Sequence, residues 1–240
     1  MFLEKLLGKN TLYYPGCLTK FVYNNLKENY EKIMKKIGIR FIEIDELVCC
    51  GSPVKNAGYI QQFKMLARKN YEILKRYNVG KILFNCPACC FVFKKEYPKL
   101  FADWSIECEH LVQTIWNAVE SKRLNLRRNG KGIVTYHDPC YLGRYLGIYE
   151  EPRKLIEYLG YKLIEMEENK DRSLCCGGGG GLRANYPQLS KEIAKDRIKQ
   201  ALDIKAKILV SSCPMCVATL SQFKKIKVLD ISELIIKHLR

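Results

Sequence analysis

Ten of the twelve cysteines in this 240-residue chain fall into two copies of one pattern, in which a single cysteine precedes a Cys-Cys pair and then a Cys-x-x-Cys unit. The first copy comprises Cys17, Cys49, Cys50, Cys86 and Cys89, with intervals of 31 and 35 residues around the pair. The second copy comprises Cys140, Cys175, Cys176, Cys213 and Cys216, with intervals of 34 and 36 residues. Thiolates are preferred ligands of soft metal ions and of metal–sulfur clusters. Each copy therefore offers five ligands to one metal centre.

The alternative use of so many cysteines is a disulfide scaffold, and the cellular compartment decides between the two. The chain has no run of 18 apolar residues, and its first ten residues lack the apolar core and cleavage site of a signal peptide. We therefore expect a cytoplasmic protein without a transmembrane segment. In a reducing cytosol, adjacent cysteines and Cys-x-x-Cys units indicate metal ligation rather than disulfides.

The residues around the cysteines repeat as well, which indicates a duplication. PGCLTK around Cys17 parallels DPCYLGR around Cys140, both Cys-Cys pairs precede a glycine, and NCPACC parallels SSCPMC. A polar, basic stretch at residues 121–132 separates the copies. We expect two cysteine-rich domains, residues 1–125 and residues 126–240.

Each half alternates short β-rich runs with helical patterns. The expected strands are residues 11–14, 41–44, 81–84, 133–136, 162–164 and 208–210. The expected helices, with apolar residues at three- and four-residue spacing, include residues 23–37, 62–77, 192–202 and 231–239. This alternation predicts an α/β fold, with one parallel sheet in each half and helices on both of its faces.

Most of the cysteines directly follow expected strands, and the Cys-Cys pairs close loops that lead into helices. In open α/β sheets, ligands bind at the carboxyl edge, where these loops converge. Helix N-termini at the same edge present free N–H groups to a negatively charged centre. We therefore expect the two cysteine groups to face one another across a pseudo-twofold axis.

Five ligands for each site point to a cluster of unusual shape. Zinc takes four ligands, and an ordinary cubane cluster takes four cysteines, commonly from a tight run that this chain lacks. Adjacent cysteines bind a single metal ion poorly because their side chains diverge, but they can serve two different irons. The pattern therefore favours a distorted cluster with a larger perimeter.

The spacing resembles that of the cysteine-rich CCG domain family. Its members include the B-subunit of heterodisulfide reductase and the iron–sulfur subunits of glycolate oxidase, anaerobic glycerol-3-phosphate dehydrogenase and lactate-utilisation systems. The resemblance implies two noncubane [4Fe-4S] clusters, one on Cys17, Cys49, Cys50, Cys86 and Cys89 and the other on Cys140, Cys175, Cys176, Cys213 and Cys216. Zinc in the N-terminal half is retained as an alternative.

Three charged or titratable residues flank the second site. His137 would relay protons, donate to a cluster sulfur or serve as a structural hydrogen-bonding residue. Arg144 and Arg183 would either steer an anionic substrate or act as ordinary surface charges. The sequence alone leaves these alternatives open.

The remaining cysteines and a glycine run have simpler interpretations. Cys90 has Val217 as its counterpart in the second copy, and Cys108 falls where the second copy has an apolar strand residue, so both are expected in the core. The run Gly177 to Gly181 lacks the spacing of a nucleotide-binding loop and predicts a close backbone approach to the cluster.

The formal net charge is +16, and the lysines are spread along helix faces. This diffuse excess indicates a solvated surface or a docking face for an acidic partner, and it argues against nucleic acid. The sequence contains no flavin, nicotinamide, haem or ferredoxin motif. A flavin- or iron–sulfur-bearing oxidoreductase subunit must therefore supply electrons, and peripheral membrane association through such a partner is compatible with the sequence.

Three functions follow from these features. The first is an iron–sulfur electron-transfer subunit that serves a flavin-linked dehydrogenase of the 2-hydroxy-acid type. The alternative is a catalytic role like that of the heterodisulfide reductase B-subunit, in which the two clusters reduce a disulfide. A metal-binding or assembly protein without redox function is the third.

Overall fold

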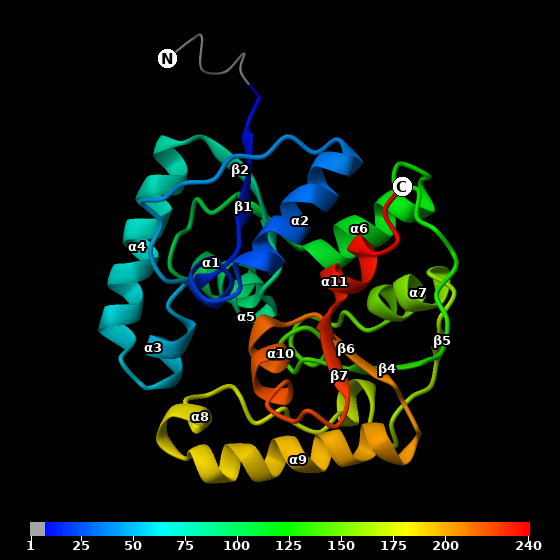
Figure 1. Ribbon diagram of the computed structural model, residues 1–240. Coiled ribbons are helices and arrows are strands. Elements are labelled where there is room, and N and C mark those ends of the chain that lie inside the picture. The colour runs from blue at the N-terminus through cyan, green and yellow to red at the C-terminus, as the bar shows by residue number, and fades with distance from the viewer. Residues whose placement is uncertain (1–7) are drawn as a thin grey trace.

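Short runs of apolar and β-branched residues form two separate parallel sheets, one in each half of the chain (Figure 1). The structure is a computed structural model that describes residues 8–240. The start of the chain, where we expect no signal peptide, lies largely outside the described residues. The first sheet has the order β1-β2-β3 and consists of β1 (Asn10–Tyr14), β2 (Val79–Phe84) and β3 (Glu107–His110). The second has the order β5-β4-β6-β7 and consists of β4 (Ile133–His137), β5 (Lys162–Leu163), β6 (Ile208–Ser211) and β7 (Lys227–Asp230).

The expected strand at residues 41–44 is wrong in extent, because only Ile42 pairs with the sheet. Ile42 forms a single bridge to Leu12, held by Ile42 N–H to the Thr11 carbonyl at 2.9 Å and Tyr13 N–H to the Ile42 carbonyl at 3.0 Å. The chain then leaves the sheet, and Glu43 forms an ion pair with Lys27. This bridge occupies the same edge position as β5, so the two halves keep one strand order.

Helices surround both sheets, as the periodicity predicts. The N-terminal half contains α1 (Cys17–Phe21), α2 (Asn24–Ile37), α3 (Ser52–Asn56), α4 (Ile60–Arg76), α5 (Pro87–Phe91) and α6 (Leu111–Glu120), and α5 continues into the π-helical turn Val92–Glu96 and the 3-10 turn Tyr97–Lys99. The C-terminal half contains α7 (Glu150–Tyr158), a 3-10 turn at Lys170–Arg172, α8 (Leu182–Asn185), α9 (Pro187–Asp203), α10 (Pro214–Leu220) and α11 (Ile231–Ile236). No helix in the described part of the chain combines the length and the apolar character needed to cross a membrane.

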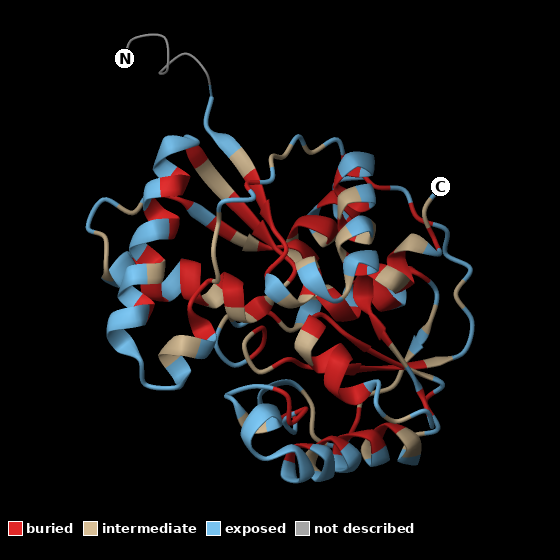
Figure 2. Ribbon diagram, turned by 60° about the vertical axis from the view of Figure 1, so that its left-hand side comes forward, coloured by how far each residue is buried: buried red, intermediate tan, exposed pale blue. Residues whose placement is uncertain are grey.

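Each sheet is buried on both faces, and successive strand residues point to opposite faces and so pack into different cores. Leu12 and Phe84 pack into an outer core with α4, whereas Tyr13 and Leu83, one position away, pack into a different core between the halves. Leu209 packs likewise toward α9. Figure 2 shows the result, with buried strands and with long outer helices that are buried only on their inner faces.

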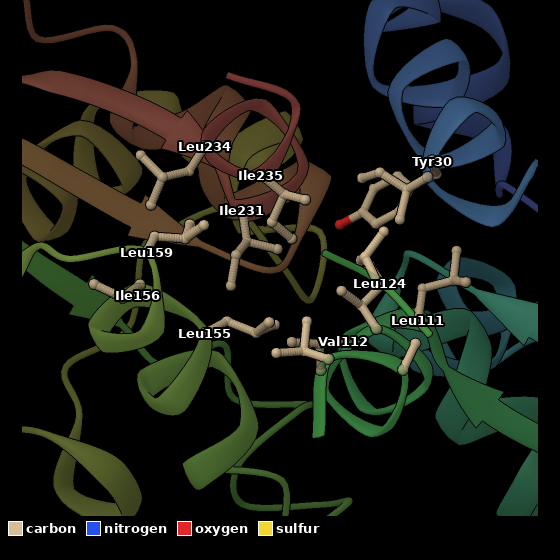
Figure 3. Packing of buried hydrophobic residues seen from close by; sticks show 14 of the residues in the cluster. Tyr30, Leu111, Val112, Leu124, Leu155, Ile156, Leu159, Ile231, Leu234 and Ile235 are labelled. Atoms are coloured by element: carbon tan, nitrogen blue, oxygen red, sulfur yellow. The ribbon is translucent and has the colours of Figure 1, made fainter. Parts of the chain in front are cut away.

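The core between the halves is formed by two helices from each of them. In this core α2 contacts α11 and α6 contacts α7. The labelled side chains of Figure 3, such as Tyr30, Leu111, Leu155 and Ile231, meet there from both halves. Helix α2 of the N-terminal half corresponds to α7 of the C-terminal half, and α6 corresponds to α11. A rotation that exchanges the two halves therefore places the pair α2–α11 on the pair α7–α6. This exchange is the expected pseudo-twofold relation.

The fold is therefore the duplicated α/β arrangement that the sequence predicts. The division at residues 125 and 126 stays a prediction, since the two halves share one continuous core.

Candidate metal centres

The five cysteines of the N-terminal pattern lie at the carboxyl edge of the first sheet. Cys17 begins α1 three residues after β1 ends, and Cys86 caps α5 two residues after β2 ends. Cys89 lies inside α5, and Cys49 and Cys50 directly precede Gly51, which caps α3. Three loops thus converge on one point, as expected from the parallel sheet.

The five thiols touch one another in a chain. The Sγ atoms of Cys50 and Cys89 are 3.4 Å apart. Cys49 contacts both Cys17 and Cys50, and Cys86 contacts Cys89. All five are free thiols.

The C-terminal pattern repeats this placement at the second sheet. Cys140 lies three residues after β4 ends, and Cys213 caps α10 two residues after β6 ends. Cys216 lies inside α10, and the pair Cys175 and Cys176 precedes the glycine run.

Here too the thiols converge. Cys176 contacts Cys175 and Cys216, and Cys216 contacts Cys213. The thiol of Cys140 is close enough to Cys213 and Cys176 for their charges to raise its pKa, although burial is the larger cause. The structure therefore brings together every cysteine that the sequence proposes for each site.

Backbone N–H groups point at the sulfur atoms in both sites. Gly51 N–H donates to Cys49 Sγ at 3.4 Å, and Gly177 N–H donates to Cys175 Sγ at 3.3 Å. Gly178 N–H donates to Cys176 Sγ at 3.4 Å. Such bonds stabilise negative charge on sulfur, which suits thiolates bound to a metal centre.

The directions of the thiol pKa shifts favour a positively charged occupant in each site. In the first site, hydrogen bonds from Cys17 and Cys50 lower the pKa of Cys49, whereas the pKa values of Cys17 and Cys50 are raised, chiefly by their hydrogen bonds to Cys49. In the second site, the hydrogen bond from Cys175 lowers the pKa of Cys176 and raises that of Cys175. Ionisation of one thiol thus opposes ionisation of its neighbours, and five thiolates can coexist only around positive ions. The donor set fits an iron–sulfur cluster, and it exceeds the four ligands of zinc.

A histidine and an arginine lie behind the second site. His137, the last residue of β4, is hydrogen-bonded to the thiol of Cys176 and lies in one compact group with Cys176 and Cys216. Its Nδ1 atom is 3.0 Å from Nε of Arg197. Arginine can only donate, so Nδ1 accepts and the proton of the neutral ring is on Nε2. In this tautomer Nε2 is the donor to the Cys176 sulfur, whereas the second nitrogen of a ligating histidine commonly donates instead of accepting.

Arg197 is a buried charged residue beside the second site that the sequence pattern did not reveal. It lies in the lysine-rich pattern of α9, where a charged side chain suggests solvent exposure, yet it is fully buried. Its position on the same helix face as the buried residues Ala194, Ile198 and Ala201 could have revealed it.

The first site has neutral residues at the equivalent positions. Tyr14 ends β1 as His137 ends β4, and its hydroxyl donates to the Val48 carbonyl at 2.8 Å rather than to a sulfur. Asn70 occupies the eleventh position of α4, as Arg197 does in α9. Its amide donates to the Cys49 carbonyl at 3.1 Å and accepts from Val48 N–H at 3.0 Å. Asn70 therefore fixes the Cys-Cys loop without adding charge.

Four of the residues with open interpretations are also placed. Cys90 is buried in α5, where burial raises its pKa to about 12, and Cys108 is buried in β3. Both belong to the core, as predicted. Arg144 donates to the carbonyls of Asp171 and Ser173 and so braces the loop before Cys175, and Arg183 lies on the short helix α8.

The two sites face each other. Helices α1 and α10, which carry cysteines from opposite halves, are in contact, and α1, α5 and α10 gather in the middle of Figure 1. Phe91 of α5 packs on Tyr141 and Tyr145, which follow Cys140. Asn56 of α3 donates to the Tyr141 hydroxyl at 3.0 Å. The expected juxtaposition of the two cysteine edges is confirmed.

Two facing pentads of free thiols on duplicated parallel sheets define a protein built to hold metal–sulfur centres. The chain belongs to the cysteine-rich CCG domain family, whose sequence profile matches residues 11–94 and again residues 134–221. The resemblance drawn from the cysteine spacing is thereby confirmed.

Characterised relatives include subunits of redox enzymes. The D-subunit of the dihydromethanophenazine:CoB–CoM heterodisulfide reductase of Methanosarcina acetivorans is 33% identical over 213 residues, which are 86% of this chain and 52% of that protein. The EtfAB:quinone oxidoreductase of Syntrophomonas wolfei is 29% identical over 94% of this chain and 34% of its own length. The B-subunit of the fumarate reductase (CoM/CoB) of Methanothermobacter marburgensis is 28% identical over 87% and 41%. The chain thus spans about half or less of the length of these relatives.

Solved structures add little. The aspartate racemase of Picrophilus torridus aligns with 95% of this chain and 91% of its own, at 12% identity and a TM-score of 0.41. A likeness this low supports no conclusion about function.

Proposed function

We propose that this chain is an electron-transfer module that holds one noncubane [4Fe-4S] cluster in each half. The observation that carries the proposal is the pair of complete five-thiol sites on facing edges. Cys17, Cys49, Cys50, Cys86 and Cys89 would hold the first cluster, and Cys140, Cys175, Cys176, Cys213 and Cys216 the second. Bound clusters would supply one-electron redox chemistry.

The chain's own residues provide the conditions for that chemistry. Cys50, Cys89, Cys176 and Cys216 are buried, which keeps water from much of each site, whereas Cys17 and Cys175 are exposed. Helices α1 and α10, which carry cysteines of opposite sites, are in contact, and we expect an electron to pass between the sites within the chain. The exposed cysteines leave the same edge open to a second redox protein.

The surface near the cysteines suits a docking partner. Phe21 is 72% exposed at the end of α1, and Tyr145 is 55% exposed after Cys140. Tyr59 and Tyr186, at the equivalent caps of α4 and α9, are 60% and 66% exposed. Exposed aromatic residues close to the sites favour protein contact.

The net charge of +16 would speed encounter with an acidic partner. We propose a flavin- or iron–sulfur-bearing oxidoreductase subunit, such as a flavin-linked 2-hydroxy-acid dehydrogenase, as that partner.

A second candidate is reduction of a disulfide between the two sites, which consumes two electrons and two protons and yields two thiols. It is supported by the facing edges, each with an exposed cysteine, and by a relative named as part of a heterodisulfide reductase. In that case a small organic disulfide would be reduced by the chain supplied with a chemical electron donor.

Anaerobic purification followed by iron, sulfide and zinc analysis tests the proposal. We expect about eight irons and eight sulfides per chain, as two [4Fe-4S] clusters require, and a paramagnetic resonance signal on reduction. Zinc in the N-terminal site would leave half of that iron. A chain without iron after anaerobic reconstitution would overturn the proposal.

Electron transfer is tested with a reduced flavoprotein partner in a stopped-flow experiment. The clusters should be reduced rapidly at low salt and more slowly at high salt, because screening weakens the attraction between a basic face and an acidic one. Turnover of a natural substrate by the isolated chain without any partner would contradict this function.

A further inference from the structure

Arg197 is a buried cation that forms no ion pair with a carboxylate of the described residues 8–240, and it lies beside the C-terminal site. It donates to His137 Nδ1 at 3.0 Å and to the Ser173 hydroxyl at 3.0 Å. It also donates to the Glu168 carbonyl at 2.7 Å and to Gln200 Oε1 at 2.6 Å. These four acceptors are uncharged, so they satisfy the hydrogen-bonding groups and leave the positive charge uncompensated.

The other charged groups buried near the two sites are paired. Arg153 binds Asp138 at 2.7 Å and Glu165 at 2.7 Å, so its charge is balanced within the described structure. Glu96 in the N-terminal half binds Lys55 and Lys99, each at 3.0 Å. Burying an unpaired charge is costly, and a fold that retains one indicates that something negative belongs near it.

The nearest carboxylates compensate the charge of Arg197 only in part. Asp138 and Glu168 act on Arg197 only from beyond ion-pair distance, and Asp138 is already bound by Arg153. The thiol of Cys216, which belongs to the proposed metal site, acts on Arg197 less strongly than these two carboxylates. The hydrogen bond from Arg197 to His137, which itself contacts Cys176, nevertheless places this charge directly behind the C-terminal site.

At the equivalent positions of the N-terminal site, the described part of the chain places neutral residues. Asn70, at the same helix position as Arg197, is fully buried and neutral. Tyr14, at the same strand end as His137, directs its hydroxyl to a backbone carbonyl. The aromatic rings of Phe93 and Tyr97, 4.3 Å apart, belong to the apolar core behind that site.

We propose that Arg197, acting through His137, gives the C-terminal site the higher reduction potential, so that the first electron taken up by the chain resides there. This inference rests on the proposed function, since it requires a cluster in each half. An added electron raises the negative charge of a cluster and its thiolates, and a fixed positive charge in a poorly polarisable interior stabilises that state. The donor bond from His137 to Cys176 acts in the same direction.

The electron balance is simple. One equivalent of reduced methyl viologen would give up one electron and become oxidised. A cluster held by the C-terminal cysteines would take up that electron, and one held by the N-terminal cysteines would stay oxidised. A donor that docks near Cys17 would then pass electrons through the N-terminal site to the C-terminal site, from which they leave the chain.

The test uses two single-site proteins, Cys50→Ser and Cys176→Ser, each titrated potentiometrically with detection by paramagnetic resonance. We expect the C-terminal cluster, measured in Cys50→Ser, to be favoured at least about tenfold for the electron, which corresponds to about 59 mV for a one-electron couple. Equal potentials, or a higher value for the N-terminal cluster, would overturn this inference and leave the proposed function intact. Absence of iron in both proteins would instead remove the proposed function and this inference with it.

Variants at Arg197 assign the cause. In the Cys50→Ser background, Arg197→Gln should lower the potential of the C-terminal cluster by a similar amount, and Arg197→Lys should restore most of it because the charge is kept. Ser173→Ala, which removes one hydrogen bond of Arg197 but no charge, is the matched control and should leave the potential nearly unchanged. If Arg197→Gln yields no folded protein, Arg197→Met, which also removes the charge, takes its place. A shift in Ser173→Ala as large as that in the variant without charge would show that loop position, not charge, sets the potential.

Discussion

The two metal sites share one set of ligand positions but differ in the residues behind the sulfur atoms. In both halves a strand end, a Cys-Cys-Gly loop and a capped helix bring five thiols together. Behind them, the first half places Tyr14 and Asn70 against an aromatic core, and the second places His137 and Arg197 in a polar network. The duplicated frame thus fixes which ligands meet. The residues behind the ligands differ between the halves, and this difference can make the two sites unequal.

The largest expected effect comes from removing a ligand from one site. Cys176→Ser should lose the iron of the C-terminal site and keep that of the N-terminal site, and Cys50→Ser should do the reverse, because each half supplies its own complete set of thiols. Iron analysis and paramagnetic resonance of both variants check this. Loss of all iron in either variant would mean that the sites share one centre, and the comparison between them would fail.

The next effect concerns the core that joins the halves. Leu155 is fully buried in the shared core and Leu74 in the outer core of the N-terminal half. Truncating either to alanine should cost about 2–5 kcal/mol in the free energy of unfolding. Because one core spans both halves, both variants should still unfold in a single transition at a lower denaturant midpoint. Two separated transitions in Leu74→Ala would show that the halves are independent.

The equivalent helix caps of the shared core also carry different titratable residues in the two halves. His110 caps α6 by accepting from Val112 N–H, and Asp230 caps α11 by accepting from Ser232 N–H. Burial lowers the pKa of His110 to about 4 and raises the pKa of Asp230 to about 6. The unfolded values are about 6.5 and about 3.9.

These shifts give opposite slopes of stability against pH. Between about pH 4 and 6 the folded state holds a proton on Asp230 that the unfolded state releases, so stability falls as pH rises. Over the same range the unfolded state holds a proton on His110 that the folded state lacks, so stability rises with pH. Each shift amounts to about 3 kcal/mol across its window.

Asparagine is a good helix cap and does not titrate, so it separates the two contributions. Relative to the parent, Asp230→Asn should gain stability as pH rises from 4 to 6, and His110→Asn should lose it. Denaturant titrations at pH 4, 5 and 6 measure both trends. Parallel pH profiles for the parent and the two variants would contradict the assigned pKa shifts.

The ligands and the alternation of strands and helices could be predicted because they repeat. Cys17, Cys49 and Cys86 each recur 123 to 127 residues later, and one register of loops implies one topology. The shared core was not predicted, since the apolar face of a helix such as α2 does not reveal which half it packs against. Arg197 was missed because its neighbours in sequence are lysines and acids. Its equivalence to Asn70 appears only when α4 and α9 are compared, because each residue is the eleventh of its helix.

The smallest effect is expected at the glycines that follow the Cys-Cys pairs. Gly51 and Gly177 have φ angles of 89° and 80°, which L residues rarely adopt. A Cβ on Gly51 would lie 2.6 Å from the ring of Phe63, whereas a Cβ on Gly177 would lie 2.5 Å from the carbonyl oxygen of Ser190 in α9. A ring can tilt, but a helix carbonyl cannot move without its helix.

We therefore expect Gly177→Ala to be the more destabilising of the two. Both variants bear the left-handed backbone cost of about 1–2 kcal/mol, and only Gly177→Ala must also displace backbone. Gly58→Ala and Gly180→Ala are the matched controls, because both positions have positive φ angles and no other atom within 4 Å of the added carbon. Denaturant midpoints should fall least in these controls, more in Gly51→Ala and most in Gly177→Ala. Iron content adds a local readout, since moving Gly177 would also disturb its N–H bond to Cys175. Equal losses of stability in Gly51→Ala and Gly177→Ala would mean that the backbone of α9 moves as easily as the ring of Phe63. The polar network of Arg197 would then be a less rigid support for the C-terminal site than the contacts indicate.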